Sequence, residues 1–121
     1  MSGAVLTVDD SSSVRVAIRI ALSGAGYSVS EAENGAEGLR KADAGAFDLI
    51  ITDLNMPVMD GLTMIEELRR NPAHTGVPII FLTTESDADL KQRAKAAGAT
   101  GWLTKPFDAD QLVRIVKKVL G

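Results

Sequence analysis

The sequence contains no cysteine and only a single histidine. Without cysteine, it can form neither a disulfide framework nor a thiolate metal site. No apolar run approaches the roughly 20 residues that a membrane-spanning helix needs. The N-terminal stretch MSGAVLTVDD also lacks the basic region that begins a signal peptide. These absences predict a soluble, cytoplasmic protein.

The chain also lacks an excess of basic residues. Thirteen lysines and arginines stand against sixteen aspartates and glutamates, which gives a net charge of −3. A general nucleic-acid-binding protein would show a basic surface, so this class is not favoured. Apolar residues make up 45% of the 121-residue chain, which is typical of a globular domain with a buried core. We expect residues 1–121 to form one domain, without a separate output domain.

Five short apolar segments alternate with five amphipathic ones. The apolar segments predict strands at residues 4–8, 27–32, 49–52, 79–82 and 100–103. Capping residues and helical spacing predict helices that begin near Ser11, Asn34, Leu62, Ser86 and Asp108. The fourth of these has a thin, alanine-rich apolar face, so we expect it to be the least firmly packed. Parallel strands need crossover connections, so the alternation predicts an α/β fold with a doubly wound, five-stranded parallel sheet and five helices.

Three carboxylates follow predicted strands. The stretch DLIITDLNMPVMDG contains an apolar strand that ends at Asp53, and Asp9 and Asp10 follow the first strand. The carboxyl ends of parallel strands meet at one edge of a sheet, so these side chains should gather there. Clustered carboxylates keep their charge most easily around a cation, and hard oxygen ligands suit Mg²⁺. The structural alternative is that these aspartates merely cap the following helices.

Further polar residues are predicted at the same edge. Lys105 follows the last strand, where its ammonium group can pair with a carboxylate or with another anionic oxygen. The next residue, Pro106, allows a cis peptide bond. Thr83 places a hydroxyl group at the end of the fourth strand. Taken alone, Lys105 would be a solvated lysine and Thr83 a satisfied strand end.

In order and spacing, these residues resemble the motif of response-regulator receiver domains, and the likeness is strongest to CheY-type single-domain receivers. The likeness covers essentially the whole chain and rests on Asp9, Asp10, Asp53, Thr83, Lys105 and Pro106. It implies a flavodoxin-like fold with strand order 2-1-3-4-5.

The resemblance also implies a role for each residue. Asp53 would accept a phosphoryl group from the phosphohistidine of a sensor histidine kinase. Lys105 would bind that phosphoryl group, and Thr83 would move toward it as the switch. The implied ligands of Mg²⁺ are Asp9, Asp10, Asp53 and the backbone carbonyl of Asn55.

Three positions bear on switching and on the phosphoryl lifetime. Trp102 stands where the family usually has a tyrosine that swings between outward and inward positions. Its indole is bulkier and can only donate a hydrogen bond, so it is either a modified switch or a tryptophan packed on the sheet edge. Asn55 and Glu85 flank the phosphoryl site and match the commoner CheY-like pairing.

The resemblance therefore implies a signalling protein rather than an enzyme, apart from Mg²⁺-dependent self-phosphorylation and self-dephosphorylation, and a monomer is the default expectation. A CheA-like kinase, a flagellar-motor target and a phosphatase are the expected partners, and chemotaxis is the expected pathway. A phosphorelay or developmental regulator, or an interaction module that is never phosphorylated, remain alternatives. A haloacid dehalogenase-type hydrolase would need a second acid at Asn55, and a nucleotide-binding module would need a glycine-rich phosphate loop. His74 lies in the loop-like NPAHTG segment and is predicted to be solvated.

Overall fold

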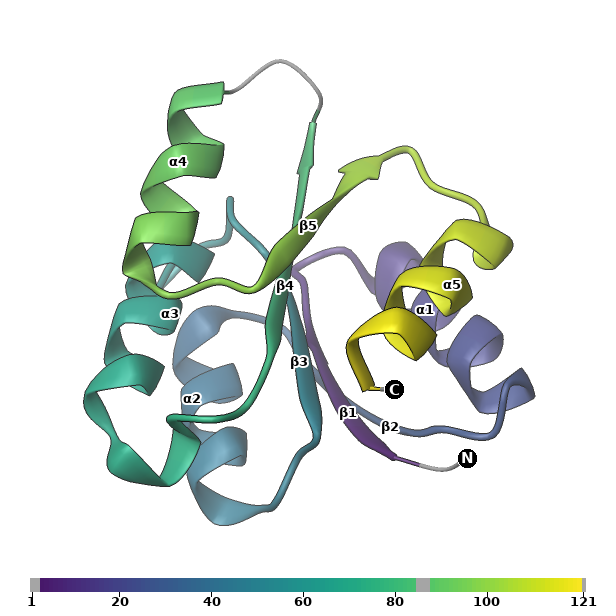
Figure 1. Ribbon diagram of the computed structural model, residues 1–121, viewed down its shortest axis with the longest axis horizontal. Helices are drawn as coiled ribbons and strands as arrows, with labels where there is room; N and C mark the ends of the chain where they lie inside the picture. The colour runs from purple at the N-terminus through teal and green to yellow at the C-terminus, as the bar shows by residue number, and fades with distance from the viewer. Residues whose placement is uncertain (1–2, 85–87, 121) are drawn as a thin grey trace.

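The computed structural model describes residues 3–84 and 88–120. Within these ranges the chain forms five strands and five α-helices (Figure 1). The strands are β1 (Ala4–Val8), β2 (Ser28–Ala32), β3 (Leu49–Asp53), β4 (Ile79–Thr84) and β5 (Gly101–Lys105). The helices are α1 (Ser12–Gly24), α2 (Gly35–Ala44), α3 (Gly61–Arg70), α4 (Ala88–Ala97) and α5 (Ala109–Leu120), with a short 3₁₀ helix η1 (Pro72–His74).

All strands are parallel, and their order in the sheet is β2-β1-β3-β4-β5. The register brings the strand ends together, since Val8 pairs with both Ala32 and Thr52. On the other side of β3, Asp53 pairs with Leu82 of β4. The predicted fold class and strand order are therefore confirmed.

The sheet is covered on both faces. Figure 1 shows α1 and α5 on one side and α2, α3 and α4 on the other. Successive strand residues point to opposite faces, so Leu6 and Ile50 enter the core under α2 and α3, while Val5 and Ile51 enter the core under α1 and α5. Every residue of β3 is buried. This double burial explains why its sequence is a continuous apolar run rather than an alternating one.

Capping side chains set most of the helix starts. The Ser11 hydroxyl accepts from the Val14 amide, and the Asn34 side chain accepts from the Glu37 amide. Asp60 caps α3 by accepting from the Thr63 amide at 2.7 Å, which begins this helix at Gly61, one residue earlier than predicted. Ser86, the predicted cap of the fourth helix, lies outside the described residues. The predicted starts of α1 and α2 are confirmed.

The fourth helix has the thin apolar face that the sequence predicts. Ala94 is the one fully covered side chain of α4, whereas α3 buries Met64, Ile65 and Leu68.

Among the described residues, no helix combines the length and apolarity needed to cross a bilayer.

The prediction that His74 is solvated is wrong. His74 is the last residue of η1 and is 8% exposed, and its Nε2 lies 2.7 Å from Oδ1 of Asp43 on α2. The Asn71 side chain accepts from the Ala73 amide, and Pro72 occupies the first turn, so the NPAH segment forms a helical turn instead of an open loop. That turn directs the imidazole inward, toward α2.

Candidate functional site

The ends of two neighbouring strands bring the three aspartates together. Asp9 directly follows β1 and Asp53 is the last residue of β3. One carboxylate oxygen from each of Asp9, Asp10 and Asp53 lies within 4.8 Å of the others. Asp9 is fully buried and Asp53 nearly so, whereas Asp10 is exposed. Solvent therefore reaches the cluster from the side of Asp10, whereas the Asp9 side chain is shielded from solvent.

Every polar atom of the Asp9 side chain has a partner. Oδ1 accepts from the Ser11 amide at 2.9 Å, and Oδ2 lies 3.4 Å from Nζ of Lys105. Burial raises the pKa of the Asp9 carboxyl, and the nearby charge of Asp53 raises it further. The Ser11 amide and the Lys105 ammonium act in the opposite direction but do not cancel the effect of burial. The ionised form of the Asp9 carboxyl is consequently destabilised, and a cation bound nearby would stabilise it.

The ammonium group of Lys105 lies between the carboxylates of Asp9 and Asp53. Its Nζ lies 3.4 Å from Oδ2 of Asp53 and the same distance from Oδ2 of Asp9. The other oxygen of Asp53, Oδ1, accepts from the Leu54 amide at 2.8 Å. The Lys105–Pro106 peptide bond is cis. Lys105 thus supplies a cation at the point where the two buried carboxylates meet.

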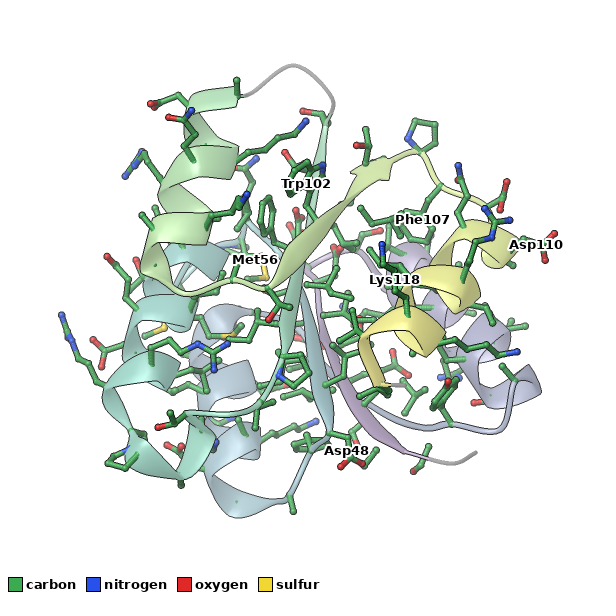
Figure 2. The ribbon with its side chains drawn as sticks, in the orientation of Figure 1. Asp48, Met56, Trp102, Phe107, Asp110 and Lys118 are labelled. Carbon is green, nitrogen blue, oxygen red and sulfur yellow. The ribbon has the colours of Figure 1, made fainter. Side chains whose placement is uncertain are left out.

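Three other residues named from the sequence lie around this centre rather than in it, whereas Glu85 lies outside the described residues. The Thr83 hydroxyl, on β4, donates to the Thr84 carbonyl at 3.0 Å. Asn55 is exposed, in the loop after Leu54. Figure 2 shows Trp102 projecting from β5 toward α4, and the residue is 38% exposed. The Nζ atoms of two α4 lysines, Lys91 and Lys95, each lie 5.4 Å from the ring centroid.

A residue that forms the base of the site was not identified from the sequence. Gly61 begins α3, and its amide donates to the Leu54 carbonyl at 3.0 Å. A Cβ atom at this position would lie 2.0 Å from the Asp53 carbonyl oxygen. Gly61 therefore allows the start of α3 to pack directly on the backbone of Asp53. The sequence signal was the glycine that directly follows Asp60 in the stretch DLIITDLNMPVMDG.

The comparisons with known proteins agree with this geometry. The family model of the response regulator receiver domain matches residues 5–117. The chain belongs to the receiver domain family.

Solved structures of receivers resemble this one closely. The chemotaxis response regulator CheY4 of Vibrio cholerae is 44% identical, with a TM-score of 0.94 and coverage of 99% of this chain and 100% of that one. The receiver domain of a signal transduction histidine kinase from Syntrophus aciditrophicus is 34% identical, with a TM-score of 0.90 and coverage of 98% and 89%. This receiver domain therefore has the CheY-like fold.

The curated relatives are longer proteins. The DNA-binding transcriptional regulator NtrC of Escherichia coli is 38% identical over 118 residues, which is 98% of this chain and 25% of that protein. The chain thus spans about a quarter of the length of the curated relatives it matches.

The donor set of this receiver domain fits a hard divalent cation. Three carboxylates can each offer an oxygen within a small region, and no softer ligand accompanies them in that group. Mg²⁺ is commonly held by one or two carboxylates together with water and phosphate. Burial is the main cause of the raised pKa of Asp9, and the charge of Asp53 adds to it, so a cation bound nearby would stabilise the ionised carboxylate. Receiver domains generally act as signalling modules of two-component systems, and an acidic pocket of this kind is where they bind Mg²⁺.

Proposed function

We propose that this receiver domain, residues 1–121, is a phosphorylation-activated response regulator in which Asp53 is the phosphoacceptor. One observation supports this most: the Lys105 ammonium lies 3.4 Å from Asp53 at the edge where three carboxylates converge. An aspartate at the end of a buried strand, beside a cation and a cluster of hard ligands, has the groups that phosphoryl transfer requires.

The phosphoryl donor is the phosphohistidine of a sensor histidine kinase. An oxygen of the Asp53 carboxylate attacks phosphorus as the P–N bond breaks, and the departing imidazole keeps the electron pair and takes up a proton. Lys105, already within 3.4 Å of Asp53 Oδ2, is placed to pair with a phosphoryl oxygen. The hydrogen bond from the Leu54 amide holds the second oxygen of Asp53 and so fixes the orientation of the carboxylate.

Asp9, Asp10 and Asp53, with the backbone carbonyl of Asn55, would hold Mg²⁺. The ion would supply charge neutralisation for the phosphoryl oxygens. Asp9 is suited to this role because its carboxylate is buried and needs a neighbouring positive charge.

Thr83 and Trp102 are the proposed switch. A phosphoryl group adds about −1.5 to −2 charges and strong hydrogen-bond acceptors. The Thr83 hydroxyl, which now donates to a backbone carbonyl, would turn to donate to a phosphoryl oxygen. Thr83 pairs with Thr104, two residues after Trp102, so movement of the end of β4 is transmitted to β5. The output surface is then formed by α4, β5 and α5.

Chemotaxis is the proposed pathway, with a CheA-like kinase as donor, a flagellar-motor protein as target and a phosphatase as a further partner. The support is the 44% identity to the chemotaxis regulator CheY4 over the full length of both chains. The relation to NtrC supports a second candidate, a receiver that acts in another phosphorelay or in gene regulation. Binding of the phosphorylated domain to a flagellar-motor switch protein would distinguish the two.

The test is intact-mass spectrometry after incubation with MgCl₂ and acetyl phosphate. The native protein should gain one phosphoryl group, and Asp53→Asn should gain none. Asp60→Asn is the matched control, because Asp60 follows in the same loop but caps α3, and asparagine caps equally well. EDTA should abolish the gain. If the native protein gains nothing from acetyl phosphate or from a phosphorylated histidine kinase, the chain is an interaction module and the proposal is wrong.

A further inference from the structure

We infer that Arg15 is a positioning residue for the acid pair Asp9-Asp10. The inference rests on the proposed cation site and extends it to a residue outside the cluster. Arg15 lies in the first turn of α1, and its side chain is 12% exposed. Its guanidinium donates from Nη1 to the carbonyl oxygen of Asp9 and from Nε to Oε1 of Glu31 at 3.2 Å. It therefore connects the segment after β1 to the end of β2.

The contact with the Asp9 carbonyl also determines the position of Asp10. The peptide group is planar, so the Asp9 carbonyl, the Asp10 amide and the Asp10 Cα share one plane. The amide of Asp9 is already held by the Ala32 carbonyl at 3.0 Å. With Arg15 on the carbonyl, the backbone on both sides of Asp9 is fixed. The Cα atom of Asp10 is therefore held in place, and its exposed side chain lies near the other two carboxylates.

Glu31 orients the guanidinium and offsets its charge. It accepts from Arg15 through Oε1 and from Arg19 through Oε2 at 2.7 Å. Arg15 and Arg19 are one helical turn apart and share this carboxylate, but of the two only Arg15 contacts Asp9. The chain thus offers a matched pair of arginines, with and without the contact to the acid pair.

Positioning and simple electrostatics predict opposite effects on Mg²⁺ binding. A positive charge near a cation site weakens cation binding, so removing Arg15 would tighten it if charge alone mattered. If Arg15 instead holds Asp9-Asp10 in place, its removal weakens binding, as loss of an outer hydrogen-bonding partner commonly does by 10-fold to 100-fold. Lysine keeps the charge but cannot bridge two acceptors with a planar fork. Arg15→Lys should therefore behave like Arg15→Ala.

The experiment is calorimetric titration of MgCl₂ into EDTA-treated, dialysed protein, without phosphodonor. We expect the Kd for Mg²⁺ to rise about tenfold in both Arg15→Ala and Arg15→Lys. Arg19→Ala should stay within about twofold of the native Kd, because its side chain does not reach the acid pair. Arg15→Met, which removes the charge and the hydrogen bonds but keeps a long side chain, is the second variant should Arg15→Ala fail to fold. Its Kd should also rise, whereas charge alone predicts that it falls.

Thermal melting in EDTA checks that each variant is folded at the titration temperature. An unchanged or lower Kd in the folded Arg15 variants, or an equal rise in Arg19→Ala, would overturn the inference. Because no phosphodonor is present, the result is separate from that of the proposed function. A native protein that binds Mg²⁺ but takes up no phosphoryl group contradicts only the phosphoacceptor role, whereas a native protein that binds no Mg²⁺ contradicts both.

Discussion

Replacing Gly61 by alanine would place a methyl group where the backbone of Asp53 already lies. The Cβ atom would be 2.0 Å from the Asp53 carbonyl oxygen and 3.0 Å from both the Asp53 carbonyl carbon and Leu54 Cα. Ordinary van der Waals contact begins at 3.4 Å. All three neighbours are backbone atoms, so no side-chain rotation can relieve the overlap. The start of α3 and the end of β3 must move apart.

This separation should be expensive. Overpacking of a well-filled region typically costs about 1–3 kcal/mol, and a clash with backbone belongs at the upper end of that range. We expect Gly61→Ala to lower the free energy of unfolding by about 3 kcal/mol, with a drop in Tm of roughly 10 °C for a chain of this length. Displacing Asp53 from Lys105 by about 1 Å should also slow phosphorylation by about a hundredfold.

Urea denaturation in EDTA measures the first effect, and the initial rate of mass gain with acetyl phosphate measures the second. Gly24→Ala is the matched control. Gly24 is the last residue of α1, and a Cβ there would meet no atom within 4 Å. That substitution should be neutral or stabilise by up to about 1 kcal/mol, because alanine restricts the unfolded chain. The reasoning fails if the two variants show the same stability, or if Gly61→Ala is phosphorylated at the native rate.

Three further predictions concern buried and half-buried polar groups. Burial raises the pKa of Asp9 above its usual 3.8, so the ionised carboxylate costs folding free energy at neutral pH, and this cost disappears once pH falls below 3.8. In EDTA, Asp9→Asn should therefore have a higher free energy of unfolding than the native protein at pH 7. Urea titrations should show this difference shrinking toward pH 4. A difference that grows as the pH falls would contradict the argument. His74→Phe should lower stability by about 1 kcal/mol, and a double-mutant cycle with Asp43→Ala should assign most of the loss to the pair. Arg69 donates to the carbonyls of His74 and Gly98 at 2.7 to 3.0 Å and to that of Thr75 at 3.5 Å, so Arg69→Met should cost about 2 kcal/mol by urea denaturation. The exposed Arg70→Met should change stability by less than about 0.5 kcal/mol.

The acid cluster could be predicted from the sequence because a parallel sheet converts positions along the chain into positions in space. An apolar run that ends at Asp9 and another that ends at Asp53 must place both residues at one edge once the strands are parallel and in register. The same rule predicts that Lys105 lies at this edge of the sheet. The predicted strand ends were less accurate, because β4 and β5 each continue two residues further. Polar residues there still pair in the sheet, as Thr84 does with Lys105.

The remaining features depend on contacts that periodicity does not encode. The position of the Trp102 side chain depends on its rotamer and on its contacts with two lysines of α4. The burial of His74 follows from local turn chemistry together with an acid on a helix distant in sequence. The bridge from Arg15 to Glu31 joins a helix to a strand sixteen residues further along, which neither a helical nor a strand repeat predicts.

The position of Lys105 links the two chemical roles proposed for this edge. Its ammonium lies equally close to Asp9 and Asp53, and it is the cation shared by both buried carboxylates. If Lys105 turns to a phosphoryl oxygen on Asp53, Asp9 loses a partner while remaining fully buried. A buried carboxylate without a compensating charge is strongly unfavourable. On the proposed function, we therefore expect Lys105 to pair with the phosphoryl group most readily when another cation stabilises Asp9. Cation binding at Asp9-Asp10 and phosphorylation of Asp53 should then favour each other by the same factor.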